Sequence, residues 1–265
     1  MLRRRAWNAR RRARHVHGLI LAGGEGSRLA ADGLTTPKPL VDVAGRPQLV
    51  RLVEQFAALG CETITCMLRD DAYEYLQRAT TVARRIDSFA TVVRCQTPSS
   101  LHTFVEGLAR VPAGNVFASM VDSVMLPNDW RAVYDGAVRY LASAADAVLA
   151  VTPALGDDDS PLWVTSDDAH RVVAVGREPG SPAARRWVTG GVYAFAPSAR
   201  VRAQSTLASG RDRMRIFLGD LVDSGARVMA VEVPYMIDVD HRQDLEKANS
   251  YLTSMTEPTP AVKGS

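Results

Sequence analysis

The chain has 265 residues, 46% of them hydrophobic and 23% charged, which is ordinary for a soluble globular protein and enough for one large α/β domain. Its formal net charge is +3, but residues 1–14 hold seven arginines, so the remainder carries −4; such an acidic body is a poor binder of polynucleotide and suits a small charged substrate carried with a metal ion. No apolar run approaches the roughly 18 residues that span a bilayer, and no signal-peptide core is present, which argues against membrane insertion and secretion. The three cysteines form no CxxC pair, which argues against a disulfide framework or a zinc site and favours the cytoplasm.

The arginine-rich segment, residues 1–15, is the first feature along the chain. A cluster of cations is typical of a contact with nucleic acid or with an anionic membrane. It is also typical of a disordered extension, or of residues upstream of the true start, and this is the interpretation that we favour. We therefore predict neither a nucleic-acid partner nor a membrane partner, and the sequence leaves a homo-oligomer open.

Strands alternate with helices through the first half of the chain. A short apolar run, His17–Ala22, ends in glycines and predicts a buried parallel strand. Helical spacing over Pro47–Leu59 stops at Gly60. Further strands are predicted at Thr63–Leu68, Thr91–Cys95, Val116–Val121 and Ala147–Thr152, with helices at about 71–86, 100–110 and 128–143. This alternation predicts βαβ units and a mostly parallel sheet.

The second half has a different pattern. Short strands next to turn residues predict an antiparallel section at Leu162–Thr165, Val172–Val175 and Val188–Phe195. A helix at about 213–224, a strand at Arg227–Val233 and a last helix at about 241–254 follow. No internal repeat and no long linker divides the chain, so we predict a single domain over residues 16–255 and a disordered tail over 256–265.

The segment after the first strand, LAGGEGSRL at residues 21–29, is rich in glycine. A strand that runs into such a turn places backbone N–H groups close to a ligand. The spacing fits neither GxxxxGK[ST] nor GxGxxG, which excludes a P-loop and a Rossmann fingerprint. Arg28 and Lys38, the latter between Pro37 and Pro39, add two cations, and two cations on a loop of amide donors suit a triphosphate.

This loop, together with PKPL at residues 37–40, resembles the signature of the sugar-1-phosphate nucleotidyltransferases, or nucleoside-diphosphate-sugar pyrophosphorylases. The pattern of that family is roughly LAGGxGTRL…PKPL, and Ser27 stands here in place of threonine. The resemblance covers about residues 16–252. It implies catalytic roles for Arg28 and Lys38 on the phosphates. The nucleotide-binding residues that it implies in the loop are Leu21, Ala22, Gly23, Gly24, Gly26 and Ser27.

Two aspartates are implied as ligands of Mg²⁺. Asp122 ends an apolar strand, where an open α/β sheet has its ligand site, and the family usually has glycine where Val121 stands. The segment IDVDHRQDL, from residue 237, resembles the family's DxDTPEDL, in which the first aspartate, here Asp238, is the second ligand. Taken alone, Asp122 is equally well explained as a helix cap or turn residue. For Asp240, a cap of the last helix is the interpretation that we favour over a metal role.

The resemblance also implies pockets for the base and the sugar. Gln96, Ser99 and Ser100 fall where the family reads the base, although serine in place of a glycine leaves the base preference open, and either serine could instead cap the following helix. Gly191, in VTGGVY, matches the glycine beside the sugar, or is needed only for close strand packing. The family's EKP element reads GREP here, so Glu178 is expected on the sugar and Arg177 in place of the lysine; a surface ion pair is at least as good an explanation.

We therefore expect a Rossmann-like three-layer α/β/α fold with a mixed, mostly parallel sheet, similar to the nucleotide-diphospho-sugar transferases. The expected reaction joins an NTP and a sugar 1-phosphate, with Mg²⁺, into an NDP-sugar and pyrophosphate. One alternative is a GT-A-like glycosyltransferase that uses an NDP-sugar, which would not need a triphosphate loop. A second is a non-catalytic, pyrophosphorylase-like regulatory subunit. The base and the sugar are left open.

Overall fold

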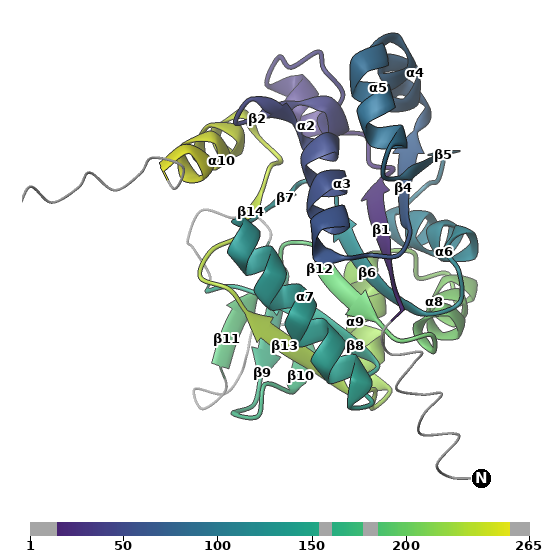
Figure 1. The fold of residues 1–265 in the computed structure, drawn as a ribbon. Helices are drawn as coiled ribbons and strands as arrows, with labels where there is room; N and C mark the ends of the chain where they lie inside the picture. The colour runs from purple at the N-terminus through teal and green to yellow at the C-terminus, as the bar shows by residue number, and fades with distance from the viewer. Residues whose placement is uncertain (1–14, 154–160, 177–184, 255–265) are drawn as a thin grey trace, which may run out of the picture.

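The computed structural model describes residues 15–153, 161–176 and 185–254, so the predicted tails lie outside it except for His15. A seven-stranded sheet in the order β13-β8-β12-β6-β1-β4-β5 forms the middle of the molecule (Figure 1). Its strands are β1 (Val16–Ala22), β4 (Ile64–Arg69), β5 (Thr91–Cys95), β6 (Asn115–Met120), β8 (Ala147–Val151), β12 (Val192–Phe195) and β13 (Val228–Glu232). Only β12 among these runs against its neighbours, β6 and β8, which confirms the mixed, mostly parallel sheet.

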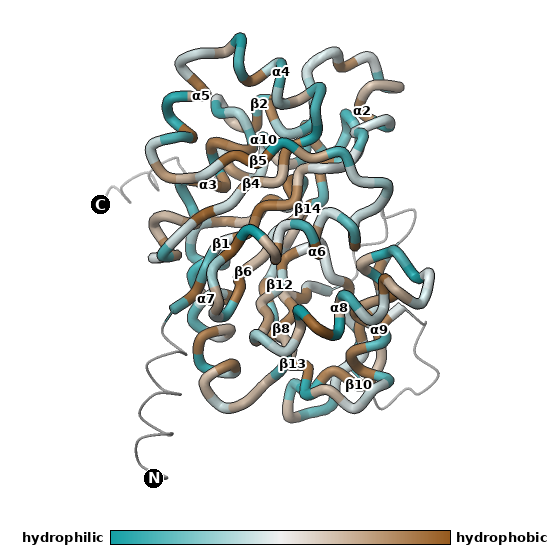
Figure 2. The backbone as a smooth tube through the Cα atoms, turned by 90° about the vertical axis from the view of Figure 1, so that its right-hand side faces the viewer, coloured by the Kyte–Doolittle hydropathy of each residue, from teal (hydrophilic) through white to brown (hydrophobic). Residues whose placement is uncertain are grey.

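Helices cover both faces of this sheet. One face carries α3 (Gln48–Leu59), α4 (Asp70–Arg78), α5 (Thr80–Asp87) and α7 (Pro127–Ala142); the other carries α6 (Ser100–Arg110), α8 (Ala199–Ala208) and α9 (Met214–Asp223). Because successive side chains of a strand point to opposite faces, Ile20 of β1 packs in the first layer and Leu19 in the second. Figure 2 shows hydrophobic residues concentrated along β1 and its neighbours. The three-layer α/β/α arrangement is as predicted.

The first layer is held by an aromatic cluster around Phe117 of β6, which is fully buried. Its ring centroid lies 5.2 Å from that of Phe56 on α3 and 5.3 Å from that of Tyr134 on α7, with Trp130 at 6.3 Å. Such packing joins two helices to the strand that leads to Asp122. The fixed position of that strand end depends on this cluster.

Replacing Phe117 with alanine should therefore lower the free energy of unfolding by about 3–5 kcal/mol, the usual cost of a cavity left by a buried phenylalanine. Urea unfolding of the variant and the parent measures it. Val201→Ala is the control, because the Val201 side chain is 70% exposed and its truncation should change the free energy by less than about 0.5 kcal/mol. Equal midpoints for Phe117→Ala and the parent would contradict this account of the core.

Three small sheets and the C-terminal helix complete the described part of the chain. Strands β9 (Trp163–Ser166) and β10 (Val172–Val175) are two strands of the predicted antiparallel section, and β11 (Arg185–Val188), which was not predicted, is the third. Two-residue strands pair as β2 (Asp42–Val43) with β3 (Arg46–Pro47) and β7 (Ser123–Val124) with β14 (Ile237–Asp238). Helix α10 (Arg242–Ser254) packs on β2, β7 and β14 through a separate apolar cluster. None of the described helices is both long and apolar enough to cross a membrane.

The structure differs from the predicted elements in three further places. The helix expected at 71–86 is two helices, because the backbone at Ala79 (φ −90°, ψ 65°) leaves the helical region. The strand expected at Val188–Phe195 is β12 of the central sheet, and it begins only at Val192, after Gly191 with its positive φ of 85°. Helix α8 was not predicted at all. Polar residues and arginines interrupt its apolar positions, and only Ala199, Ala203 and Thr206 are buried.

Candidate active site

The carboxyl ends of β1, β4, β5 and β6 meet at one edge of the sheet, where an open parallel sheet usually has its ligand site. Strand β1 runs into the glycine loop, residues 23–26, which leads to the short helix α2 (Ser27–Ala31). Lys38 begins the 3-10 turn η1 (Lys38–Leu40), and Asp122 follows β6. The fold therefore brings the predicted loop, cations and first aspartate to one place.

Two of the three glycines of the loop have a structural reason, and each reason is different. Gly26 has a φ of +61°, and a Cβ there would lie 2.9 Å from the Cβ of Lys38. A Cβ on Gly23 would lie 2.7 Å from Oγ1 of Thr103, a residue of α6. Gly24 has an ordinary φ and no described atom within 4 Å of such a Cβ. Gly23 and Gly26 are thus required by the fold, whereas Gly24 borders open space.

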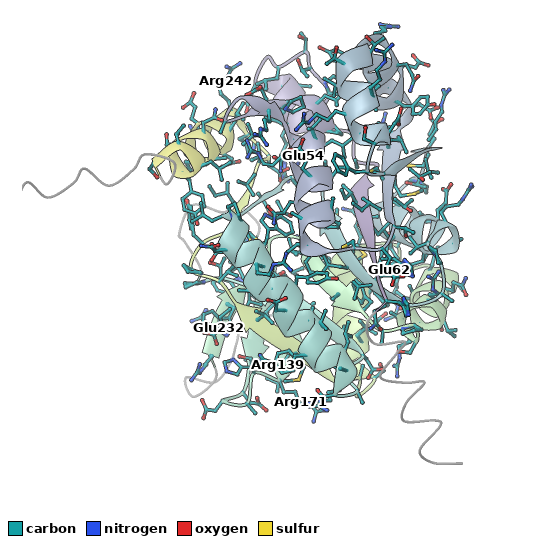
Figure 3. All side chains as sticks on the ribbon, viewed as in Figure 1. Glu54, Glu62, Arg139, Arg171, Glu232 and Arg242 are labelled. Atoms are coloured by element: carbon teal, nitrogen blue, oxygen red, sulfur yellow. The ribbon has the colours of Figure 1, made fainter. Side chains whose placement is uncertain are left out.

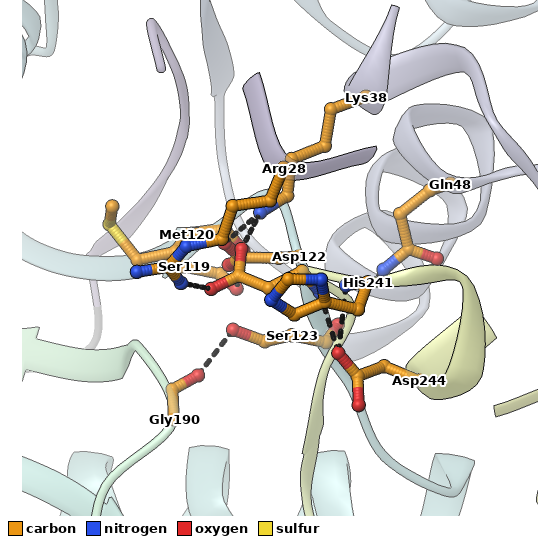
Figure 4. A network of polar contacts seen from close by, with 11 residues as sticks. Arg28, Lys38, Gln48, Ser119, Met120, Asp122, Ser123, Gly190, His241 and Asp244 are labelled. Atoms are coloured by element: carbon orange, nitrogen blue, oxygen red, sulfur yellow. Dashed lines mark hydrogen bonds and ion pairs between the residues drawn. The ribbon is translucent and has the colours of Figure 1, made fainter. Parts of the chain in front are cut away.

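The two predicted cations lie on a pair of carboxylates (Figure 4). Nζ of Lys38 lies 2.7 Å from Oδ2 of Asp122 and also contacts Oδ1 of Asp240. Nη1 of Arg28 donates to the other oxygen of Asp240 at 2.6 Å. The Lys38 side chain is only 12% exposed, against 58% for Arg28. Lys38 is therefore the inner cation of this cluster, and Arg28 faces solvent.

Asp240 was interpreted as a helix cap, and this is wrong. Its carboxylate is engaged by Lys38 and Arg28. Asp244 takes the capping role instead, because its Oδ2 accepts hydrogen bonds from the backbone N–H groups of Asp240 (3.2 Å) and His241 (2.8 Å). Because Asp244 accepts these bonds, the Asp240 side chain is available to Lys38 and Arg28 beside the glycine loop.

The charges of the cluster stabilise one another. Burial opposes the charged form of Lys38, but the carboxylates of Asp122 and Asp240 outweigh it and raise the pKa of the Lys38 ammonium group above its ordinary value. Burial likewise opposes ionisation of Asp240, but Lys38 and Arg28 outweigh it and lower the pKa of its carboxyl group. Both residues are thus held in their charged forms at neutral pH.

A pH dependence of stability follows from Asp240. Because its folded-state pKa lies below the unfolded value of 3.8, its contribution to the free energy of unfolding is present above about pH 4 and is lost as the pH falls through the folded pKa. Asp240→Asn should therefore flatten the loss of stability as the pH falls below about 4, measured by urea unfolding along a pH series. A slope in that window equal to the parent's would contradict the role given to this ion pair.

Asp238 lies close to the same cluster. Strand β14 pairs it with Ser123, the neighbour of Asp122, and the backbone N–H of Val239 donates to the carbonyl of Asp122 at 3.0 Å. Gly190 gives its side chain room, since a Cβ there would lie 2.7 Å from Oδ1 of Asp238. The backbone thus holds Asp238 of β14 next to Asp122, which lies one residue before the partner strand β7.

These two carboxylates suit a hard divalent cation. Burial raises the pKa of the Tyr193 phenol, and the charges of Asp238 and Asp122 add to that effect. Both carboxylates therefore lie near enough to the buried Tyr193 hydroxyl to disfavour its ionised form. Among the described residues, no group of three or more histidine, cysteine or acidic side chains is arranged for a metal. A pair of carboxylates completed by phosphate oxygens and water is how Mg²⁺ is usually held.

A cavity of about 240 Å³ lies on the other side of the glycine loop. Gly23 and Gly24 form one wall of it, and the run Thr97–Ser100 after β5 forms another. Ser99 is the N-cap of α6, and Oγ of Ser100 accepts from the N–H of Met214, so both serines have structural roles while they line the cavity. Gln96 is exposed and does not line it. Its role in base recognition stays a prediction.

The predicted sugar residues are only partly described. Gly191 has the positive φ noted above, and a Cβ there would lie 2.6 Å from Cγ of Met120. Its carbonyl accepts from the N–H of Met120 at 2.8 Å, so close packing against β6 is one reason for this glycine. Arg177 and Glu178 lie outside the described residues.

Two features of the site could not be predicted from any motif in the sequence. Arg69, the last residue of β4, lines the cavity together with Glu25 of the loop. In addition, Oδ2 of Asp32, just after α2, accepts from the backbone N–H of Arg242 at 2.9 Å and lies 3.2 Å from Nδ1 of His241. The guanidinium of Arg242, labelled in Figure 3, donates to the Asp32 carbonyl at 2.9 Å. His241 and Arg242, which stand where the family has TP, thus join the segment that carries Asp238 and Asp240 to the end of α2.

Comparison with known proteins agrees with this geometry. A family model described as a MobA-like NTP transferase domain matches residues 18–190. The chain is 24% identical over 264 residues to a mannose-1-phosphate guanylyltransferase of Mycobacterium tuberculosis, covering 94% of this chain and 68% of that protein. It is 27% identical over 250 residues to a glucose-1-phosphate thymidylyltransferase of Streptomyces antibioticus, covering 92% and 68%. A crystal structure of a Bacillus anthracis protein described as a glucose-1-phosphate thymidylyltransferase superposes with a TM-score of 0.75 at 15% identity, covering 92% of this chain and 98% of the other, and shares its fold.

Proposed function

The chain belongs to the MobA-like NTP transferase family and is a nucleotidyltransferase, and on that premise we propose that it makes an NDP-sugar and pyrophosphate from an NTP and a sugar 1-phosphate. The observation that carries this proposal is the joint arrangement of Lys38, Asp122 and Arg28 at the glycine loop. The loop offers N–H groups, and the two cations offer positive charge where a triphosphate would bind. Relatives that act on sugar 1-phosphates support this substrate class.

The chemistry is an in-line displacement at the α-phosphorus of the NTP. An oxygen of the sugar phosphate forms the new P–O bond, the bond from the α-phosphorus to the bridging oxygen breaks, and pyrophosphate leaves with the electron pair. The attacking phosphate is already an anion, so no general base is required. Charge builds up on the leaving pyrophosphate, and Lys38 and Arg28 stabilise it by exchanging their carboxylate partners for phosphate oxygens.

Asp122 and Asp238 would hold Mg²⁺. When bound, such an ion neutralises the oxygens of the α-phosphate and lowers the barrier to attack by another anion. The pairing of β7 with β14 and the bond from the N–H of Val239 to the carbonyl of Asp122 hold the two backbones together, and Gly190 keeps the space beside Asp238 open. Gly191, Glu178 and Arg177 are proposed to contact the sugar phosphate.

Mixing the protein with Mg²⁺, one NTP and one sugar 1-phosphate tests the proposal, with pyrophosphate release as the signal. Mannose 1-phosphate and glucose 1-phosphate are the first sugars to try, because relatives are described with them. A GT-A-like glycosyltransferase would release NDP from an NDP-sugar and no pyrophosphate. A regulatory subunit would bind nucleotide and release neither.

Gly24 gives a test of the triphosphate loop that is separate from folding. Because a Cβ on Gly24 meets no described atom within 4 Å, Gly24→Ala should leave the free energy of unfolding within about 0.5 kcal/mol of the parent's. The added methyl would occupy the space where a phosphate approaches the backbone, so KM for the NTP should rise about tenfold or more. Steady-state kinetics and urea unfolding measure the two quantities; an unchanged KM would contradict the placement of the triphosphate on this loop.

A further inference from the structure

The cavity beside the glycine loop contains one pair of opposite charges. Glu25 and Arg69 are the only charged residues that line it within the described chain, and Nη1 of Arg69 lies 3.0 Å from Oε1 of Glu25. The remaining lining is glycine, hydroxyl and apolar side chains. A ligand in this cavity therefore meets one guanidinium and one carboxylate side by side.

The order of the strands places this pair on the nucleoside side of the site. Asp122 and Lys38 lie at the end of β6, on one side of β1. Arg69 ends β4, on the other side of β1, and is paired in register with Cys95 at the end of β5. A nucleotide whose triphosphate lies on the glycine loop between them has its phosphates toward Asp122 and its base toward Arg69.

The surroundings of Arg69 indicate that it is not a structural arginine. Arginines elsewhere that are held by the fold donate to backbone carbonyls: Arg200 donates to those of Val111 and Pro112, and Arg131 to that of Leu59. In the part of the chain that the structure describes, Arg69 contacts only the carboxylates of Glu25 and Asp71. Both carboxylates are exposed, and ion pairs with exposed carboxylates contribute little to stability, so the fold does not explain why a guanidinium stands at this wall.

We propose that Arg69 and Glu25 read the base of the NTP and that the base is guanine; this inference rests on the function proposed above. Guanine offers two neighbouring acceptors, O6 and N7, to a guanidinium, which is the commonest specific contact of arginine with a base. It also offers two neighbouring donors, N1–H and N2–H, to a carboxylate. Adenine, cytosine and uracil or thymine each lack part of this set. The Arg69–Glu25 pair orients both groups before the base arrives.

Kinetics with base analogues test the proposal. The parent should have its highest kcat/KM with GTP, about tenfold or more above ITP, which lacks the 2-amino group, and above 7-deaza-GTP, which lacks N7. Arg69→Gln should lower kcat/KM for GTP by about 10- to 100-fold and remove the preference over 7-deaza-GTP. Glu25→Gln should remove the preference over ITP. Arg69→Lys should not restore the preference over 7-deaza-GTP, because an ammonium group lacks the fork of donors.

Arg94→Gln is the matched control. Arg94 is another arginine in an ion pair near the end of a neighbouring strand, with Nε 2.8 Å from Oδ1 of Asp70, but it does not line the cavity, so its replacement should leave every ratio unchanged. The proposal is overturned if the parent prefers another NTP, or if Arg69→Gln lowers kcat/KM equally for all of them. In that case the nucleotidyl transfer itself still stands. If no NTP is turned over, the proposed function fails. The dissociation constants of GTP and ITP, measured by calorimetry, then still test base reading by the Arg69–Glu25 pair, and equal affinities would overturn it.

Discussion

Asp122→Asn is expected to lower kcat by about 10³-fold, equivalent to about 4 kcal/mol of transition-state stabilisation. The amide keeps the shape of the side chain but loses the charge that Mg²⁺ and Lys38 both require. Affinity for the sugar nucleotide should be partly retained, because the glycine loop and the cavity do not depend on Asp122. Pyrophosphate release under saturating substrates measures the first quantity, and calorimetry measures the second.

The chain offers a closely matched control for this substitution. Asp220 on α9 is 21% exposed, against 20% for Asp122, and is also paired with a cation, Arg211, at 2.5 Å. Asp220→Asn should cost some stability and leave kcat within about twofold, because Asp220 lies outside the proposed site. If Asp122→Asn remains as active as Asp220→Asn, the metal assignment is wrong.

Lys38→Met should also lower kcat by about 10³-fold, because the inner cation of the phosphate site is lost. It should in addition lower the free energy of unfolding by about 2 kcal/mol, less than the loss of a fully buried partner because both carboxylates are partly exposed. Asp122 would then lose the cation at its carboxylate, and Asp240 would keep only Arg28 among the described residues. Added Mg²⁺ should recover part of that stability, although not the activity.

Steady-state kinetics and urea unfolding with and without Mg²⁺ test this second prediction. Arg211→Met, the cation of the matched pair, is the control and should respond to Mg²⁺ no more than the parent does. A Lys38→Met protein with parental kcat would exclude Lys38 from the phosphate site. A variant whose stability is unchanged would show that the ion pairs contribute nothing to the fold.

Much of the site was predictable because its chemistry demands particular residues at particular spacing. The loop glycines follow β1 directly, Arg28 and Lys38 come next in the same motif, and Asp122 lies just beyond β6, so a motif and a strand pattern are enough to bring them together. The parallel sheet was predictable because its strands are continuous apolar runs, such as β1, which is buried along its whole length.

The remainder depended on contacts that no local pattern records. Arg69 meets Glu25 only because β4 lies beside β1 in the sheet. Asp240 looked like a helix cap because it precedes a helix, but Asp244 takes that role and the side chain of Asp240 turns to Lys38. Asp32 gave no sign that it binds Arg242, which lies 210 residues further along the chain.

The central claim is that this chain joins a nucleotide to a sugar 1-phosphate. The most direct measurement incubates the protein with Mg²⁺, each NTP in turn and a panel of sugar 1-phosphates, and follows pyrophosphate together with the mass of the nucleotide product. The account predicts equal amounts of pyrophosphate and NDP-sugar, formed only when both substrates are present, and lost in Asp122→Asn. Absence of pyrophosphate with every NTP and every sugar phosphate, from a folded protein that binds nucleotide, would contradict it.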